Sequence, residues 1–547
     1  SLHDALPISQ AAKLSVDELA ACKTLAAMLE VLHAASASAP VAALAVVVEQ
    51  RDVTQAVEEF PFQRFVLRSR EIACIEADSI DFSGQRLVIV EDDRGLAQVL
   101  ALRLRERQAS VAVLSLAQAM AQDFAGISTL LDLTCISSNS GANEVKRQFA
   151  VLQAALMAGV QRVTVVTALG GDFGTRAPNP QQGGGVAGML KTIAREFDSV
   201  TAQCLDVDAG ESNEALLGYI LAELTARDHV VEVAWSQGRR WQRQATALDL
   251  DVSALAQLPL QTDSVVLLTG GARGITALMA VELARRFQCQ VELVGRSPLP
   301  LADEPTTTRE LRDPRELRQA LLAENTGRKP AEIEALLRSR LADRDMRATL
   351  AAVQAAGGRV NYHALDVRDS VALEALVADI YARHGRIDGV IHGAGVVEDK
   401  LVRDKVEDSF ARVFDTKVSS ALTLSQCIRD DVRFVVFFSS VASAFGNRGQ
   451  VDYAAANDML DKIAHHWQAR IAGRVLSVNW GPWADTGMVS PALQREYARK
   501  GIGLIPQAVG VSALFAALTE ASRETQIVMM SGQVERFIDD HALAAEA

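Results

Sequence analysis

The chain has 547 residues, too many for a single ordinary hydrophobic core, so its length predicts two or more domains. Its 49% hydrophobic and 22% charged residues are typical of a soluble globular protein, and its net charge of −13 argues against nucleic-acid binding as the main role. Six scattered cysteines without a CxxC pair, no signal peptide and no apolar run of membrane length favour a reduced, cytoplasmic compartment.

Residues 1–60 are rich in alanine, and apolar side chains recur in them at helical spacing before Pro61 ends the pattern. The spacing is carried by Leu25, Met28, Leu29 and Leu32. It predicts a linker or docking helix without chemistry of its own. Residues 536–547 carry no pattern of a closing element, and we expect a tail there, as in a fragment of a longer polypeptide.

Residues 61–247 alternate short apolar runs with a helical pattern, which is typical of βαβ units in a doubly wound parallel sheet. The predicted strands are 87–90, 111–114, 129–134 and 163–166, and a helix is predicted over 96–107. After the first strand stand Glu91, Asp92 and Asp93, whose carboxylates would repel a pyrophosphate. We therefore expect a Rossmann-like subdomain that binds no dinucleotide.

A second unit of the same α/β kind, 265–535, follows a linker at 248–264. Its first strand, 265–268, leads directly into a glycine-rich turn, and a helix is predicted from there to about Phe287. Glycines permit a tight turn and a close approach to a pyrophosphate, which the amino end of the helix meets with free N–H groups. This context favours a dinucleotide site made of Thr269, Gly270, Gly271, Ala272, Arg273, Gly274 and Ile275.

The second strand of this unit, 291–294, ends at Arg296 and Ser297. The end of this strand is where the adenosine ribose of a bound dinucleotide lies. An acidic residue there would suit the free 2′-hydroxyl of NAD, whereas Arg296 and Ser297 suit a 2′-phosphate. The position favours NADPH as the cofactor over the alternative of a solvated surface arginine.

A charged, amphipathic stretch, 298–341, interrupts this unit and predicts two helices separated at 325–327. We expect this insertion to serve packing or partner contacts rather than chemistry. The third strand, 360–365, follows it, and the next residues, Asp366 and Val367, are expected beside the adenine edge of the cofactor.

The fourth strand, 389–392, leads into three small residues that would let the nicotinamide half of a cofactor pass close to the backbone. His392 ends this strand, and a structural histidine with satisfied hydrogen bonds is the favoured interpretation. His465 and His466 are expected on an exposed helix in structural roles, because adjacent residues do not share a helix face. A helix over 405–424 carries Lys417.

A polar cluster is predicted after the next buried strand, 434–438. Ser439 and Ser440 follow this strand, and Tyr453 and Asn457 then lie four residues apart on one face of a helix start. Ligands of an open α/β sheet bind at the carboxyl ends of its strands. A hydroxyl, a phenol and an amide gathered there predict the chemical site.

A sixth strand, 475–479, is followed by a loop that contains 486–488 and leads into the final helices. A segment in this place is suited to close over a substrate like a lid.

Five motifs stand in order along the chain. They are Thr269-Gly270-Gly271-Ala272-Arg273-Gly274, His392-Gly393-Ala394-Gly395, Ser439-Ser440, Tyr453-Ala454-Ala455-Ala456-Asn457 and Asn479-Trp480-Gly481-Pro482-Trp483. Together they resemble the short-chain dehydrogenase/reductase superfamily and, more narrowly, the ketoreductase domain of type I polyketide synthases and polyunsaturated-fatty-acid synthases, over about residues 60–535. The resemblance implies a truncated, non-catalytic first subdomain, with 185–192 as its characteristic passage, and a complete catalytic second subdomain.

The resemblance implies catalytic roles for Ser440, Tyr453, Lys417 and Asn457. Ser440 lies thirteen residues before Tyr453 (453 − 440), as expected in this family, and this spacing selects it over Ser439. Most short-chain reductases carry a lysine four residues after the tyrosine. In the synthase ketoreductases the lysine and the asparagine exchange places, and Lys417 on the preceding helix matches the exchanged lysine.

The same resemblance extends the cofactor contacts to Gly393, Ala394, Gly395 and Pro482 and places Asp399, Phe445 and Trp483 on the substrate side. Asp399 matches the last acid of the Leu-Asp-Asp motif of B-type ketoreductases, although the first two positions differ here. Phe445 stands where the tryptophan of A-type enzymes would fall. A D-configured hydroxyl product is therefore expected, and no metal site.

These assignments predict an oxidoreductase that uses NADPH to reduce a β-ketoacyl thioester on an acyl carrier protein to the β-hydroxyacyl thioester, in polyketide or fatty-acid biosynthesis. Tyr453 would donate the proton and Ser440 a hydrogen bond, while the Lys417 cation would favour the phenolate and Asn457 would order a water or orient the lysine. The expected partners are the carrier protein and other synthase domains, with no nucleic acid and no membrane. A catalytically silent scaffold domain is the alternative, and the cofactor-free first half argues against a free-standing dehydrogenase for small alcohols.

Overall fold

The computed structural model describes residues 61–75, 82–137, 141–249, 258–300, 304–485, 491–499, 501–520 and 524–532. All of them belong to one compact unit, Val57–Ala547. The helix predicted in residues 1–60, the tail 536–547, the loop at 486–488 and residues 250–257 of the expected linker lie outside the described residues.

The described part consists of two α/β halves that follow one another along the chain. The strands of the first half are β1 (Phe62–Ile72), β2 (Arg86–Val90), β3 (Ser110–Leu114), β4 (Thr129–Asp132), β5 (Arg162–Thr167), β6 (Thr201–Val207), β7 (Glu232–Ser236) and β8 (Arg239–Ala247). Its helices are α4 (Leu96–Glu106), α5 (Leu116–Met120), α6 (Ala142–Met157), α7 (Val186–Glu196) and α8 (Asn213–Thr225), with a 3₁₀ turn at Thr134–Ile136.

The second half repeats this alternation. Its strands are β9 (Val265–Thr269), β10 (Gln290–Gly295), β11 (Arg359–Ala364), β12 (Gly389–His392), β13 (Phe434–Ser440), β14 (Arg474–Trp480), β15 (Ile502–Gly503) and β16 (Gln526–Gly532). Its helices are α9 (Gly274–Phe287), α10 (Thr306–Arg309), α11 (Pro314–Glu324), α12 (Pro330–Ala355), α13 (Ser370–His384), α14 (Glu407–Cys427), α15 (Val441–Phe445), α16 (Val451–Gln468), α17 (Pro491–Arg499) and α18 (Gln507–Thr519), with a 3₁₀ turn at Val402–Asp404.

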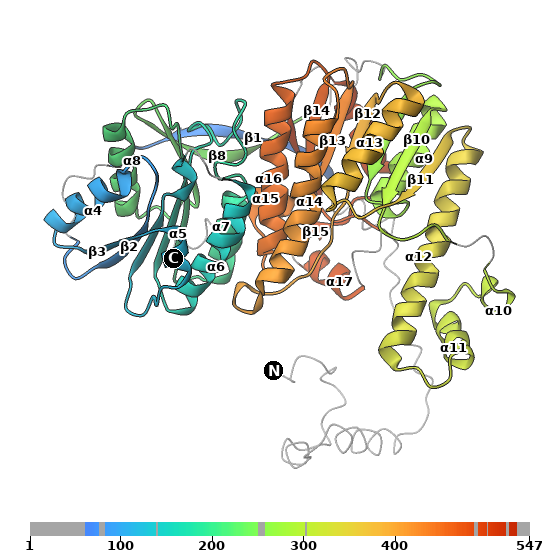
Figure 1. Cartoon of the computed structure of the whole chain (residues 1–547), viewed down its shortest axis with the longest axis horizontal. Coiled ribbons are helices and arrows are strands. Elements are labelled where there is room, and N and C mark those ends of the chain that lie inside the picture. The colour runs from blue at the N-terminus through green and yellow to red at the C-terminus, as the bar shows by residue number, and fades with distance from the viewer. Residues whose placement is uncertain are drawn as a thin grey trace, which may run out of the picture. The chain divides into compact units, whose positions relative to one another are not determined.

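All strands join in one sheet, in the order β11-β10-β9-β12-β13-β14-β16-β1-β8-β7-β6-β5-β4-β2-β3, with β15 paired to β16. Strand β1 connects the halves, because it pairs antiparallel with β16 on one side and with β8 on the other (Figure 1). Within each half the central strands are parallel. The predicted α/β class with a doubly wound, mostly parallel sheet is therefore confirmed, and the two predicted sheets are continuous.

The sequence missed β1 because this strand has no continuous apolar run. Phe65 and Val66 are buried, whereas Arg68, Ser69 and Arg70 are exposed. A strand that is half exposed in this way lacks the hydrophobic signal that made the fully buried strands readable.

The two halves correspond strand for strand in the sheet order. In the sheet, the neighbouring strands β3-β2-β4-β5-β6-β7 of the first half have the same order as β10-β9-β12-β13-β14-β16 of the second half. The first half has no counterpart of β11, which lies beyond β10 at the edge of the second half. The first half is thus a truncated version of the second, as the resemblance implied.

Helices α7 and α16 meet at the contact between the halves, and they approach so closely that no side chain fits at Gly185 or Gly188. A Cβ atom added to Gly188 would lie 2.4 Å from the carbonyl oxygen of Ala454, and one added to Gly185 would lie 2.8 Å from that of Ala455. The Asp458 carboxylate accepts the Gly185 N–H at 3.0 Å and thereby holds the amino end of α7. Gly185 and Gly188 therefore serve a close backbone contact between the halves.

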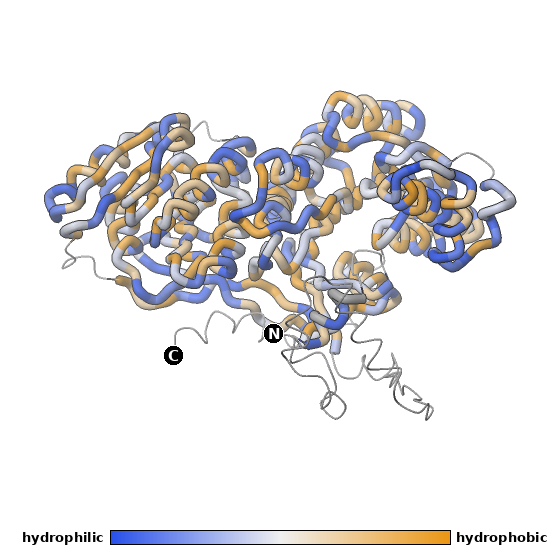
Figure 2. The backbone as a smooth tube through the Cα atoms, turned by 90° about the horizontal axis from the view of Figure 1, so that it is seen from below, coloured by the Kyte–Doolittle hydropathy of each residue, from blue (hydrophilic) through white to orange (hydrophobic). Residues whose placement is uncertain are grey.

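Helix α16 is largely buried, which corrects the expectation of an exposed helix around His465. Burial of the His465 ring lowers its pKa to about 3, so this side chain is neutral. His466, one residue on, is exposed and hydrogen-bonds through Nδ1 to the carbonyl oxygen of Pro178 at 2.8 Å. Along most elements hydrophobic and hydrophilic residues alternate, as expected where one face is buried (Figure 2).

The insertion forms helices α10 and α11 and the first turns of α12. Leu317 and Leu321 of α11 pack with Ile333 and Leu337 of α12 in a small separate core. The second predicted helix does not stop at 341, because α12 continues to Ala355 and forms the crossover to β11. The insertion is therefore an elongation of a crossover helix plus a hairpin that packs against it.

Candidate active site

Ser440 is the last residue of β13, and Tyr453 lies in the first turn of α16, so the strand and the helix bring the two together. The Ser440 hydroxyl accepts the Ala442 N–H at 3.2 Å, which leaves its own proton available for donation. Burial raises the pKa of the Tyr453 phenol, although hydrogen bonding with the Asn457 and Ser440 side chains lowers it. The structure thus brings the predicted hydroxyl and phenol into one site.

Lys417 projects from α14 into the same site. Its Nζ donates to the carbonyl oxygen of Phe438 at 2.7 Å and lies 5.5 Å from the centroid of the Tyr453 ring. Burial lowers the pKa of Lys417 to about 7, and the charge of Asp461 only partly opposes this shift. The structure brings Lys417 to Tyr453, while burial raises the pKa of the Tyr453 phenol.

Asn457 is fully buried one helical turn after Tyr453. Its Nδ2 donates to the backbone carbonyl of Tyr453 at 2.7 Å. Its Oδ1 has no hydrogen-bond partner among the described residues. A buried amide oxygen without a partner is a place that a water molecule or a ligand group would satisfy.

A buried polar network behind the site escaped sequence analysis. Its centre is Asp461, which accepts hydrogen bonds from four side chains. These are Ser443 at 2.7 Å, Ser477 at 2.5 Å, Asn479 at 2.9 Å and Gln526 at 3.0 Å. The spacing of Tyr453, Asn457 and Asp461 by four residues was the available signal, because it puts all three on one stripe of α16.

The turn after β9 fits an anionic group. Gly270, Gly271 and Gly274 have φ values of 114°, 84° and 60°. A Cβ atom on Gly270 would lie 2.7 Å from the backbone of Gly393, so the turn tolerates no side chain there. Arg273 stands at the amino end of α9 and makes no side-chain cap, which leaves the first N–H groups of the helix open to an anion.

The other residues predicted in this turn have mixed surroundings. Ala272 is buried, whereas Arg273 is exposed and Ile275 is partly exposed. The hydroxyl of Thr269 hydrogen-bonds to Nδ1 of His392 at 2.7 Å, so it holds the neighbouring strand.

The end of β10 places Arg296 on the surface and Ser297 beside Tyr362. The Tyr362 hydroxyl donates to the carbonyl oxygen of Ser297 at 2.7 Å. Asp366 pairs with Arg368 at 2.6 Å, and the hydrogen bond from Arg368 lowers the pKa of this carboxyl group. The sequence pointed to Asp366 but gave no signal for Tyr362, which holds the adjoining backbone, or for Arg368, which holds the carboxylate.

The loop after β12 runs beside Lys417. A Cβ atom on Gly395 would lie 2.9 Å from Cε of Lys417. His392 hydrogen-bonds through Nε2 to the Lys417 carbonyl at 3.0 Å, and burial lowers the pKa of this histidine to about 3. His392 therefore has the structural role predicted for it, since it is neutral and both of its ring nitrogens have partners.

The three residues predicted on the substrate side have different surroundings. Asp399 is exposed, and each of its two carboxylate oxygens accepts a hydrogen bond from Nε2 of Gln450 at 3.1 Å. Phe445 ends α15 and packs partly buried near Phe65. Trp483 is only 2% exposed, and its ring packs 4.9 Å from that of Trp480.

The placement of Trp483 corrects its assignment to the substrate side. A Cβ atom on Gly510 would lie 2.3 Å from the Trp483 ring, so α18 covers this side chain. The neighbouring Pro482 carbonyl accepts the Ile505 N–H at 2.8 Å. Trp483 therefore belongs to the core beneath α18.

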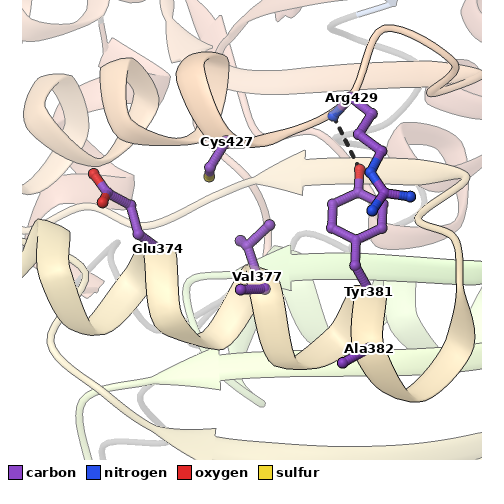
Figure 3. Close-up of a pocket in the computed structure, with 7 residues that line it drawn as sticks. Glu374, Val377, Tyr381, Ala382, Cys427 and Arg429 are labelled. Carbon is purple, nitrogen blue, oxygen red and sulfur yellow. Dashed lines mark hydrogen bonds between the residues drawn. The ribbon is translucent and has the colours of Figure 1, made fainter.

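A pocket of about 400 Å³ lies elsewhere, between α13 and the end of α14 (Figure 3). It is lined by Glu374, Val377, Ala378, Tyr381, Ala382, Cys427 and Arg429. The Arg429 N–H donates to the Tyr381 hydroxyl at 3.0 Å, and its guanidinium lies 4.1 Å from the ring centroid. None of the predicted site residues lines this pocket.

In the part of the chain that the structure describes, no helix is both long enough and apolar enough to cross a membrane.

Comparison with known families and proteins agrees with this geometry. Residues 264–485 match the family model described as KR domain. The chain is 30% identical over 408 residues to a polyunsaturated fatty acid synthase protein of Thraustochytrium sp., a match covering 68% of this chain and 14% of that protein. It is 27% identical over 373 residues to polyketide synthase PksN of Bacillus subtilis, covering 66% of this chain and 6% of that protein.

Among solved structures, a ketoreductase domain from the bacillaene assembly line aligns with a TM-score of 0.64 at 23% identity, covering 88% of this chain and all of that one. This alignment supports the fold of both halves. The matched segments span only a small share of the synthases named above.

Proposed function

Because the chain belongs, through residues 264–485, to the KR domain family found in polyketide and polyunsaturated-fatty-acid synthases, we propose that it reduces a β-ketoacyl thioester to the β-hydroxyacyl thioester with NADPH. KR domains of polyketide synthases are oxidoreductases. The observation that carries the proposal is the convergence of Ser440, Tyr453 and Lys417 at the carboxyl end of β13.

The residues around the glycine turn fit a nicotinamide dinucleotide. The uncapped amino end of α9 would meet its pyrophosphate, and Arg296, which is exposed, would meet a 2′-phosphate. Gly393 and Gly395 would lie along its nicotinamide half. NADPH supplies the hydride when it is bound there.

The side chains of the site account for the remainder of the reaction. Reduction places negative charge on the former carbonyl oxygen, which needs hydrogen-bond donors and finally a proton. Ser440 donates a hydrogen bond to this oxygen, and Tyr453 donates the proton through its hydroxyl. The raised pKa of Tyr453 keeps the phenol protonated before reaction, and the adjacent Lys417 cation stabilises the phenolate that remains.

The proposed substrate is carried on the phosphopantetheine of an acyl carrier protein, because the relatives are multidomain synthases. Asp399 and Phe445 support a D-configured product through their match to the B-type pattern. The other domains of such a synthase are the proposed partners.

The test is NADPH oxidation with a β-ketoacyl pantetheine thioester by the wild-type chain and by Tyr453→Phe. We expect the substitution to lower kcat by about 10²–10⁴-fold while NADPH still binds, because only the proton donor is removed. Wild-type turnover at the same rate as Tyr453→Phe would refute the proton donor. A wild-type chain that binds NADPH but oxidises none would favour the scaffold alternative.

A further inference from the structure

Glu196, the last residue of α7 in the non-catalytic half, reaches across to two loops of the catalytic half. Its Oε2 accepts the Val402 N–H at 2.7 Å, and its Oε1 accepts the Gly449 N–H at 2.8 Å. Val402 lies in the loop after β12, and Gly449 lies in the loop before α16. One carboxylate therefore links two segments that lie far apart in the sequence.

These two loops carry the substrate-side residues and also contact each other directly. The Lys400 N–H donates to the Gly449 carbonyl at 2.9 Å. Gln450, the residue next to Gly449, donates to both oxygens of Asp399 at 3.1 Å. Glu196 thus closes a ring of hydrogen bonds in which the position of Asp399 depends on the distance between the loops.

Helix α15 and the loop between it and α16 also contact α7. Lys191 Nζ donates to the Ser443 carbonyl at 3.2 Å, and Arg195 Nε donates to the Phe445 carbonyl at 2.7 Å. A Cβ atom on Gly446 would lie 2.7 Å from the backbone of Lys191, so loop and helix are in direct contact. The chain between Ser440 and Tyr453 is therefore shaped against the non-catalytic half.

On the other loop, α6 adds a second support. Gln153 Nε2 donates to the carbonyl oxygens of Val402 at 2.6 Å and Lys405 at 2.7 Å. Gln153 bonds to the loop after β12 and has no hydrogen bond to the loop before α16 among the described residues. Glu196 bonds to both loops. Hydrogen bonds to a charged acceptor are stronger than those between neutral groups, so Glu196 is well placed to fix the spacing of the loops.

We propose that Glu196 is a positioning residue for the substrate, one that sets the distance between the Asp399 loop and the amino end of the Tyr453 helix; this rests on the proposed ketoreduction. The orientation of the acyl chain at the site, and with it the face of the carbonyl that is reduced, then depends on a residue of the half that binds no cofactor. The glycine turn and the Arg296 strand end, which would meet the two phosphate groups, lie outside this ring of hydrogen bonds, so we expect the Kd for NADPH to change little when Glu196 is replaced.

The test compares Glu196→Gln and Glu196→Ala with a matched control, Glu214→Gln. Glu196→Gln keeps the shape but turns an amide N–H toward one of the two backbone donors. Glu214 lies on α8 of the same half and pairs with Arg103 at the surface, 2.6 Å away, and it contacts neither loop among the residues that the structure describes. The probe is a racemic 2-methyl-3-oxopentanoyl pantetheine thioester with NADPH.

We expect both Glu196 variants to raise KM for the thioester by about tenfold or more and to move the ratio of product stereoisomers toward equality, with the Kd for NADPH unchanged. The control should behave as wild type in all three measurements. A wild-type KM and stereoisomer ratio in Glu196→Ala would overturn the proposal. So would a lowered melting temperature with an unchanged stereoisomer ratio, because that pattern describes a purely structural residue.

Amide hydrogen exchange provides a readout that needs no turnover. In Glu196→Ala the peptides that contain Val402 and Gly449 should exchange faster than in wild type, while those of β9 and α9 remain unchanged. Unchanged exchange in both loops would overturn the positioning role. A wild-type chain that is inactive with the thioester would refute the proposed ketoreduction, and the exchange result would still decide whether Glu196 holds the loops.

Discussion

The two halves differ sharply at the turn after their first strand. In the first half, Asp92 follows β2 and its carboxylate accepts N–H groups from Leu96 at 3.1 Å and Ala97 at 2.8 Å, at the amino end of α4. In the second half, the corresponding helix α9 begins at Gly274 without a side-chain cap. The same strand–turn–helix unit is closed by the protein's own anion in one half and left open to an external anion in the other.

A carboxylate at this turn provides acceptors for the helix amino end without any ligand. The first N–H groups of a helix need acceptors, and a phosphate or a carboxylate can serve equally. The acids after β2 predicted repulsion of a pyrophosphate, and in the structure the Asp92 carboxylate accepts the N–H groups of Leu96 and Ala97 at the amino end of α4. The first half then uses its α7 to support the catalytic helix α16.

We expect the largest effect from placing an acid, like Asp92 of the first half, in the turn after β9 of the second half. In Gly271→Asp we expect the Kd for NADPH to rise about 100-fold or more over that of Gly271→Asn, because juxtaposed like charges cost several kcal/mol. The asparagine variant has the same shape and bears the same strain at φ 84°. Fluorescence titration of NADPH measures the difference, and equal losses in both variants would show that charge does not separate the two turns.

Two buried lysines of α14 and α16 offer a second comparison, with an intermediate effect. Burial lowers the pKa of Lys417 in the site to about 7, whereas for Lys462 at the contact with the first half the charges of Asp458 and Glu232 outweigh burial and raise the pKa. We expect kcat/KM to fall up to about tenfold as the pH rises through 7, because Lys417 then loses its charge beside Tyr453.

The control for this pH profile is Lys417→Met, which should be slower and flat across the same range, whereas Lys462→Met should keep the wild-type profile. The lowered pKa of Lys417 also has a consequence for stability. Between pH 7 and its ordinary value of 10.5, the unfolded chain binds a proton that the folded chain has released, so this residue makes the free energy of unfolding rise with pH there. A wild-type profile in Lys417→Met would assign the pH dependence to another group.

The smallest effect is expected from removing the carboxylate that caps α4 in the first half. Asp92→Ala should lower the free energy of unfolding by about 1 kcal/mol, the usual cost of removing a carboxylate from the amino end of a helix, and should leave the Kd for NADPH unchanged. Urea unfolding and a binding titration measure the two quantities. If the variant bound a second equivalent of NADPH, Asp92 alone would be what separates the two turns.

Much of the fold was readable from the sequence because its central strands are buried on both faces. The runs that became β2, β9 and β13 are continuously apolar, and their positions were predicted closely. Strand β1 was not readable because half of it is exposed, so the junction of the two sheets was missed. The crossover helix α12 was predicted too short, because the boundary between an insertion and its host helix leaves no mark in a continuous helical pattern.

The site was readable where its residues are close in sequence. Tyr453 and Asn457 lie one turn apart, and Ser440 ends an apolar run that predicted a strand. Lys417 was found by resemblance alone, since nothing in its local sequence indicates burial. The assignment of Trp483 to the substrate side was wrong because the sequence does not say which side of a loop α18 will cover.

By itself, the sequence determined the α/β class, the positions of the central strands along the chain and the stretch from Ser440 to Asn457, because these follow from local periodicity and short spacing. Only the tertiary structure decided how deeply Lys417 is buried and that Glu196 reaches the loops at Val402 and Gly449. The two Glu196 contacts join residues 206 and 253 positions apart in the sequence. Such contacts are set by the packing of whole elements, which no local pattern encodes.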